Sequence, residues 1–240
     1  MFWKLSHLTD LLFPRTCAGC GLALLEQGMH VCWDCRETLS IISPPFCSCC
    51  GEPVHGRIDH AYVCHSCMKR PPAYRHARAA IHYNVIGKRL VTQFKYNHAL
   101  WLETMLAELL AAGVQAHLRP DDYDVITAVP LHPVKRRERG YNQSWLLAKS
   151  LAGLLNKPIC RPDSLKRTRP TPSQTRLTAG KRLTNVLGAF NVNDPRAWMG
   201  KRVLLIDDVM TTGATASACA TVLREAGAEY VDVATVARGI

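Results

Sequence analysis

Residues 203–215, which read V-L-L-I-D-D-V-M-T-T-G-A-T, constrain the fold of this 240-residue chain more than any other segment. Residues 203–206 are continuously apolar and branched, which is typical of a short strand buried on both faces of a parallel sheet. Ligands bind at the carboxyl ends of the strands in such sheets. We therefore expect the two acids that follow, Asp207 and Asp208, to lie at a ligand-binding edge.

The residue types after this strand suit a phosphorylated sugar. Adjacent carboxylates can accept hydrogen bonds from a vicinal diol, such as the 2- and 3-hydroxyls of a ribose, and they favour a nearby Mg²⁺. The turn after them consists of Thr211, Thr212, Gly213, Ala214 and Thr215. It offers hydroxyls and free backbone N–H groups at the start of a helix expected over residues 213–226, where the helix dipole stabilises a phosphate. We predict a ribose-phosphate site; the alternative is an ordinary capped helix with both acids solvated.

The same thirteen residues resemble the phosphoribosyl pyrophosphate (PRPP) signature of type I phosphoribosyltransferases. This resemblance implies that the acid pair holds the ribose and that the following loop wraps the 5-phosphate.

Cysteine is concentrated near the start of the chain, where residues 17–67 hold nine of the eleven cysteines. Eight of them form four C-x-x-C pairs, and the two halves of this segment repeat at an offset of 30 to 32 residues. Four thiolates satisfy a tetrahedral Zn²⁺, and such pairs in a cytoplasmic protein indicate metal ligands rather than disulfides. We predict a tandem zinc ribbon with two structural zinc ions. The first would be held by Cys17, Cys20, Cys32 and Cys35, and the second by Cys47, Cys50, Cys64 and Cys67.

The ligand sets leave one alternative open. Cys49 is a surplus thiol, and His55, His60 or His65 could replace a cysteine in a Cys₃His site. A closed four-ligand site has no open coordination position, so we expect the metal to stabilise the fold and not to catalyse. A structural zinc contributes on the order of 10 kcal/mol to a segment this poor in core residues.

The net charge and the absence of targeting signals limit the class of protein. The formal net charge is +11, and two zinc-bound Cys₄ groups would leave about +7. Such a chain attracts polyanions, including phosphorylated substrates and nucleic acid. Polar residues interrupt the first fourteen positions, so no signal peptide is expected, and no transmembrane segment is apparent. We expect a soluble cytoplasmic protein.

Strand and helix patterns alternate behind the cysteine-rich segment. Strands are expected at 78–84, 124–130, 189–192, 203–206 and 230–236, with two helices within 85–115 and others at 142–156 and 213–226. This alternation predicts an α/β fold with a parallel sheet flanked by helices. We expect a zinc-binding domain over residues 1–72 and a second domain over residues 73–240.

Two basic segments lie near the expected ligand edge. The first contains Lys135, Arg136, Arg137 and Arg139, which could neutralise a pyrophosphate. The second, residues 165–185, has no acidic residue and contains Lys166, Arg167, Arg169, Arg176, Lys181 and Arg182. Its proline-rich centre excludes a helix and favours a mobile loop that closes over a charged ligand. A third basic stretch, Lys69, Arg70, Arg75 and Arg78 with Tyr74 and His76, is either a single-strand contact or a charged linker.

The cysteine-rich segment, R-G-Y-N-Q at 139–143, R-T-R-P-T-P-S-Q at 167–174 and residues 203–215 together closely resemble the competence protein F (ComF) family over nearly the whole chain. The resemblance implies a zinc-binding segment followed by a type I phosphoribosyltransferase-like domain, and an association with natural transformation. It also implies a pyrophosphate loop at 129–132, with Leu131, His132 and the nearby Arg139 as binding residues. The flexible loop would be 167–174, with Arg167 and Arg169 acting beside the acid pair in catalysis.

Two functions from different classes remain open. The first, favoured by the family resemblance, is a PRPP-binding protein that uses Mg²⁺ with PRPP and handles incoming single-stranded DNA, with other competence proteins as further partners. The second is an active phosphoribosyltransferase of nucleotide salvage or synthesis. A zinc-dependent regulator with a degenerate site is weaker, because the acids and the threonine turn are intact. An ATPase is weaker still, because Arg follows every Gly-Lys pair and there is no P-loop.

Overall fold

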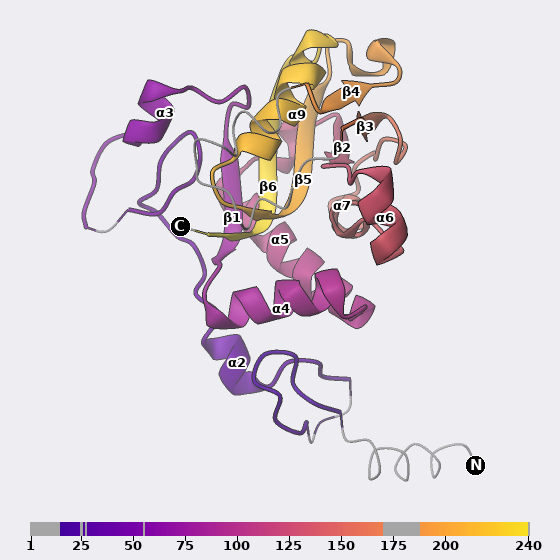
Figure 1. The fold of residues 1–240 in the computed structure, drawn as a ribbon. Helices are drawn as coiled ribbons and strands as arrows, with labels where there is room; N and C mark the ends of the chain where they lie inside the picture. The colour runs from indigo at the N-terminus through magenta and orange to yellow at the C-terminus, as the bar shows by residue number, and fades with distance from the viewer. Residues whose placement is uncertain (1–14, 25, 27, 55, 170–187, 240) are drawn as a thin grey trace.

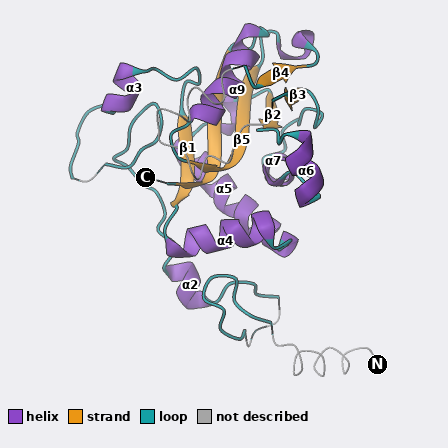
Figure 2. Ribbon diagram, viewed as in Figure 1, coloured by secondary structure: helices purple, strands orange, loops and turns teal. Residues whose placement is uncertain are grey.

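A four-stranded parallel sheet forms the centre of the protein (Figures 1 and 2). The computed structural model describes residues 15–24, 26, 28–54, 56–169 and 188–239. The strands are β1 (Ala77–His82), β2 (Val125–Ala128), β5 (Arg202–Met210) and β6 (Tyr230–Arg238), and their order in the sheet is β1-β6-β5-β2. Since all three pairings are parallel, the carboxyl ends of the four strands share one edge.

Helices cover both faces of this sheet (Figure 1). The helices are α4 (Val85–Tyr96), α5 (Glu103–His117), α7 (Gln143–Leu154) and α9 (Ala214–Glu225). Along β5 the buried side chains alternate: Leu204 and Ile206 belong to the core that contains α4, α5 and α7, whereas Val203 and Leu205 belong to the core that contains α9. The continuous apolar run is thus buried on both sides, as the sequence predicts for a strand inside a parallel sheet.

A separate two-stranded antiparallel sheet joins β3 (Leu165–Arg167) to β4 (Phe190–Val192). The strand expected at 189–192 is present as β4, and it pairs with β3 outside the parallel sheet. Leu165 and Phe190 bury one side of this small sheet in the same core as α9, so a strand of three residues is stabilised without a place in the parallel sheet.

Two further elements differ from the expectation. The helix α6 (Pro133–Arg139) was not predicted, because its sequence lacks an apolar stripe; it starts with proline at its first position and ends at Gly140, where φ is +79°. The strand β5 continues through both acids to Met210, four residues beyond the predicted segment. The shorter helical elements are α2 (Trp33–Glu37), α3 (His65–Lys69), η1 (Leu100–Leu102), η2 (Pro120–Asp122) and η4 (Pro195–Trp198).

The two halves of the cysteine-rich segment lie at different places on the sheet domain (Figure 1). The first half, with α2, lies against α4: Cys17 and Cys35 share a core with Leu90, and Arg89 Nη1 donates to the carbonyl of Gly19 at 2.8 Å. The second half, with α3, lies beside β1, where the Ala77 N–H donates to the Cys49 carbonyl at 2.7 Å. The parallel sheet, the flanking helices and the cysteine groups confirm the predicted fold class.

Among the described residues, no helix is both long and apolar enough to cross a bilayer.

Candidate functional site

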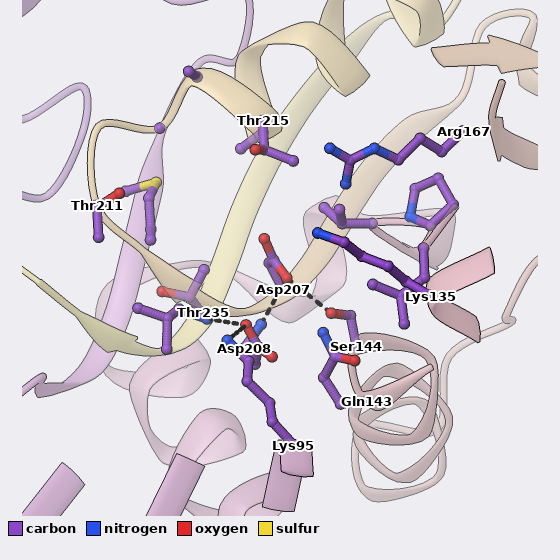
Figure 3. A pocket seen from close by; sticks show the side chains of 18 of the residues that line it. Lys95, Lys135, Gln143, Ser144, Arg167, Asp207, Asp208, Thr211, Thr215 and Thr235 are labelled. Atoms are coloured by element: carbon purple, nitrogen blue, oxygen red, sulfur yellow. Dashed lines mark hydrogen bonds and ion pairs between the residues drawn. The ribbon is translucent and has the colours of Figure 1, made fainter. Parts of the chain in front are cut away.

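A cavity of about 170 Å³ opens at the carboxyl edge of the sheet, where the end of β5, the start of α9, the loop after β2 and the start of α7 meet (Figure 3). It is lined by Lys95, Val129, Pro130, Leu131, Lys135, Arg139, Gln143, Ser144, Arg167, residues 207–211, residues 213–216 and Thr235. The segments that the sequence marked as an acid pair, a threonine turn and two basic stretches therefore contribute to one site.

Asp207 lies in the middle of the cavity (Figure 3). One of its carboxylate oxygens accepts hydrogen bonds from the hydroxyl of Ser144 at 2.8 Å and from the backbone N–H of Asp208 at 2.9 Å. Burial, and next the negative charge of Asp208, raise the pKa of Asp207 to about 7. The carboxylate is therefore positioned by its neighbours and is close to its titration point at neutral pH.

Asp208 is buried, with 3% of its surface exposed, and its two carboxylate oxygens have different surroundings. Oδ1 accepts from the Val209 N–H at 2.6 Å and pairs with Lys95 Nζ at 2.9 Å. Burial alone would lower the pKa of Lys95, but the charge of Asp208 and the hydrogen bond to it raise that pKa. Oδ2 is buried and has no hydrogen-bond partner among the described residues. A buried carboxylate oxygen without a donor is costly, so the charge of Asp208 depends on the contacts of Oδ1.

The turn after β5 presents the start of α9 to the cavity. Thr211, Gly213, Ala214 and Thr215 line it, and α9 begins at Ala214. Gly213 has φ of +73°, and a Cβ at this position would lie 2.7 Å from the hydroxyl of Tyr74. Glycine is therefore required by both the backbone and the close neighbour.

Thr212, the remaining residue of the predicted turn, does not line the cavity. Its hydroxyl instead accepts from the Ala214 N–H at 3.4 Å.

Three cationic side chains line the cavity in addition to Lys95. Lys135, Arg139 and Arg167 all line it, and Lys135 and Arg167 point towards Asp207 in Figure 3. Burial, followed by the charges of Arg167 and Arg139, lowers the pKa of Lys135, and burial also lowers the pKa of Arg167. Gathering like charges at a partly buried place is unfavourable without a counter-charge, so this side of the cavity suits an anion.

Aromatic and polar neighbours position two of these cations. The Arg167 guanidinium lies 5.4 Å from the ring centroid of Phe190, and that of Arg139 lies 4.8 Å from the ring of Tyr96. Arg139 also donates to the side-chain carbonyl of Gln143.

Not every predicted binding residue reaches the cavity. Leu131 lines it, whereas His132 caps α6, where its Nδ1 accepts from the Val134 N–H at 3.3 Å. Arg169 is exposed and does not line the cavity. Residues 170–174 of the predicted flexible loop lie outside the described residues. The roles of His132, Arg169 and Thr212 in binding therefore remain predictions.

Several residues that line the cavity were not predicted, among them Lys95, Ser144 and Thr235. Lys95 lies near the end of α4, far from every motif, and Thr235 lies inside an ordinary apolar strand. A signal was available only for Ser144, which follows R-G-Y-N-Q directly.

Two arginines in the stretch after the second cysteine half are held by polar contacts. Arg75 pairs with the fully buried Asp232 at 2.6 Å and lies 3.7 Å from the ring centroid of Tyr230. Arg78 donates to the carbonyls of Ala77 and Ser48. These contacts attach the segment to the sheet and favour a structural role for both arginines.

The two cysteine groups fit tetrahedral zinc. In each set of four, all Sγ atoms lie within 4.8 Å of one another, and the sets are the two that the spacing predicts. The Cys20–Cys32 and Cys50–Cys64 sulfur distances are both 3.7 Å, against about 3.8 Å for the edge of a Zn–S₄ tetrahedron with bonds near 2.3 Å. Backbone N–H groups donate to sulfur in both sets, for example Cys32 to Cys17 and Cys64 to Cys47, each at 3.3 Å.

The fold and the cavity together define the class: a parallel sheet flanked by helices, with a cavity at its carboxyl edge and two amino-terminal Cys₄ groups. Similarity to known proteins then identifies the family. The chain is 30% identical to competence protein F of Haemophilus influenzae over 232 residues, which span 94% of this chain and 98% of the relative. The chain belongs to the competence protein F family.

Other comparisons of sequence agree with this assignment. A family model of a double zinc ribbon domain matches residues 8–68. The DNA utilization protein YhgH of Salmonella typhi is 31% identical over 219 residues, which cover 85% of this chain and 94% of the relative. The competence protein ComFC of Bacillus subtilis is 27% identical over 223 residues, covering 92% and 88% respectively. Among solved structures, a glutamine PRPP amidotransferase from B. subtilis, complexed with ADP and GMP, is 26% identical and has a TM-score of 0.36; the match covers 55% of this chain and 25% of that chain.

Proposed function

We propose that the cavity binds PRPP together with Mg²⁺, and that the protein acts in the cytoplasm on incoming single-stranded DNA during natural transformation. One observation carries the PRPP assignment: the acid pair, the start of α9 and the cations Lys135, Arg139 and Arg167 line one cavity. The ribose hydroxyls would donate to the acids at the end of β5, where Asp207 lies in the middle of the cavity.

The proposal also gives the 5-phosphate and the pyrophosphate of PRPP a binding place in the cavity. The turn at 211–215 and the start of α9 receive the 5-phosphate, because backbone N–H groups and the helix dipole favour an anion there. Lys135, Arg139 and Arg167 receive the pyrophosphate. Lys95 keeps the buried Asp208 paired while the sugar is bound.

The role in DNA handling rests on the relatives. Two of them are competence proteins and another is a DNA utilization protein, each similar over at least 85% of this chain. The net charge of +11 is in keeping with a polyanionic partner.

Calorimetric titration of PRPP and Mg²⁺ into the zinc-loaded protein tests the site. We expect millimolar or tighter binding, which Asp207→Asn combined with Asp208→Asn abolishes, a loss on the order of 4 kcal/mol. Asp207→Asn alone keeps the Lys95–Asp208 pair and so separates loss of binding from loss of folding. Asp121→Asn, at a fully exposed carboxylate, is the control with the same charge change. Equal heats from wild type and the double variant would remove the assignment.

A second candidate, an active phosphoribosyltransferase of salvage or synthesis, is favoured by the three cations beside the acid pair. Departure of pyrophosphate requires stabilisation of its developing charge, and Lys135, Arg139 and Arg167 could supply it. The test is pyrophosphate release from PRPP in the presence of each common base. Arg167→Gln should slow any release, and no release with any base would exclude this candidate.

A further inference from the structure

A second cavity, of about 620 Å³, lies beside the first, between α6 and the segment that leads into β3. Pro130, Leu131 and Arg167 line both cavities, so the two share a wall at the carboxyl end of β2. We call the second cavity the α6–β3 groove. The other residues that line the groove have no part in the PRPP binding proposed above.

The groove combines apolar surface with cationic side chains. Its apolar lining includes Pro130, Leu131, Pro133, Pro162 and Leu165. Its cationic residues are Arg136, Arg137 and Lys166, all exposed, in addition to the shared Arg167. Asp163 is the one acid among the residues that line it. A ligand that presents a flat apolar surface and negative charge within a short distance matches this lining.

We propose that the α6–β3 groove binds single-stranded DNA, with an unstacked base against the apolar lining and the adjoining phosphates on Arg136, Arg137 and Lys166. This inference rests on the proposed function, in which single-stranded DNA is the partner, and it adds where the strand lies. Through the shared wall at Pro130 and Leu131, a strand in the groove would run next to bound PRPP.

The chemistry favours a single strand over other polyanions. The bases of a duplex are stacked inside the helix and cannot enter a cavity, whereas a single strand can place one base on apolar surface and keep its backbone on cations. The arginines after the second cysteine half are less suitable, because Arg75 and Arg78 already bind a buried carboxylate or backbone carbonyls. For Arg136, Arg137 and Lys166, in contrast, no ion pair occurs among the described residues.

The test is fluorescence anisotropy of a labelled oligo(dT) with the full-length, zinc-loaded protein at several salt concentrations. Arg136→Gln combined with Arg137→Gln should weaken binding on the order of tenfold near 0.1 M salt. It should also lower the slope of log K against log salt by about 1.4, which is two phosphate contacts at about 0.7 each. Lys166→Gln should remove one contact more.

The matched control is Arg119→Gln combined with Arg224→Gln. These exposed arginines lie just before η2 and in the last turn of α9, away from the groove, and the pair changes the net charge equally. An oligo(dT) that carries 4-thiothymidine supplies a direct readout: its photo-crosslinks should map to peptides containing residues 130–142 or 162–168.

The possible results distinguish failure of the groove assignment from failure of the proposed function. If wild type binds no oligonucleotide, both the DNA role and the groove assignment are wrong. If wild type binds but the groove variant and the control variant bind alike, or the crosslinks map elsewhere, the groove assignment alone is wrong. Equal affinity for a duplex of the same length would also overturn it, because a duplex cannot place a base in the groove.

Discussion

Lys95 and Asp208 form a largely buried ion pair although no local pattern links them. Their side chains are 18% and 4% exposed, and the N–O distance is 2.9 Å. Removing one partner of such a pair leaves the other charge buried and unpaired, which is far more costly than replacing both partners.

Lys95→Met should therefore lower the free energy of unfolding by about 3 kcal/mol. Chemical denaturation of the zinc-loaded protein measures this change. In the double variant with Asp208→Asn, much of the loss should be recovered, because no uncompensated charge remains. Additive losses in the two single variants would show that the pair does not act as a unit.

The raised pKa of Asp207 predicts a pH-dependent stability. Because the folded-state pKa is about 7 and the unfolded value is about 3.9, the folded state holds a proton that the unfolded state releases between these values. This proton stabilises the folded state, and its contribution is fully present below pH 4. The contribution is lost as the pH rises to about 7, at roughly 1.4 kcal/mol per pH unit.

Comparison of wild type with Asp207→Asn isolates this effect, since other titrations are common to both proteins. In the absence of PRPP, the difference in unfolding free energy should fall from pH 5 to pH 7 and then stay level to pH 8.5. A difference independent of pH would contradict the raised pKa of Asp207.

At the scale of elements, Arg238 joins the end of β6 to the second cysteine half. The side chain is 6% exposed; its Nη1 donates to the Cys50 carbonyl at 2.8 Å and its Nη2 to the Cys50 sulfur at 3.4 Å. A zinc ion bound by four thiolates carries a net negative charge, so a buried guanidinium beside it supplies a counter-charge.

Arg238→Met should speed zinc release from the second cysteine group and leave the first unchanged. Arg238→Lys should be intermediate, because a single ammonium cannot make both contacts. Release into a chromogenic chelator measures both rates. The same release kinetics for all three proteins would contradict a role for Arg238 in holding the metal.

The elements were predictable to different degrees. Long periodic segments such as α5 and α7 were recognised, because their apolar faces repeat at the helical period. The strand β4 was recognised but its pairing with β3 was not, because three residues carry no information about their pairing partner. The helix α6 was missed because it has no buried apolar face; Pro133 at its first position, the His132 cap and Gly140 at its end define it instead.

At the scale of the whole molecule, the first cysteine group packs into the hydrophobic core beside the sheet. Cys17 and Cys35 belong to the same core as Leu90 and Phe94 of α4, and α4 also carries Lys95 into the cavity. Loss of the first zinc should therefore disturb a site far from it in the sequence.

Removal of zinc by a strong chelator should lower the Tm by roughly 10 °C or more, since several kcal/mol are lost and each kcal/mol shifts a domain of this size by about 2–4 °C. It should also weaken the PRPP binding proposed above. Calorimetry before chelation, after chelation and after zinc is restored measures both effects. A sheet domain that melts at an unchanged temperature and binds PRPP equally well without zinc would contradict this coupling.

Local sequence was sufficient for the parallel-sheet class, the two Cys₄ sets and the acid–threonine segment, because each depends on spacing between residues that are close along the chain. It was not sufficient for Lys95, Ser144 or Thr235, which reach the cavity only when α4, α7 and β6 pack around β5. The pairing of Asp208 with Lys95, the unpartnered Oδ2 and the groove beside α6 arise in the same way. Burial and long-range contact create these features, and neither is encoded in the spacing of neighbouring residues.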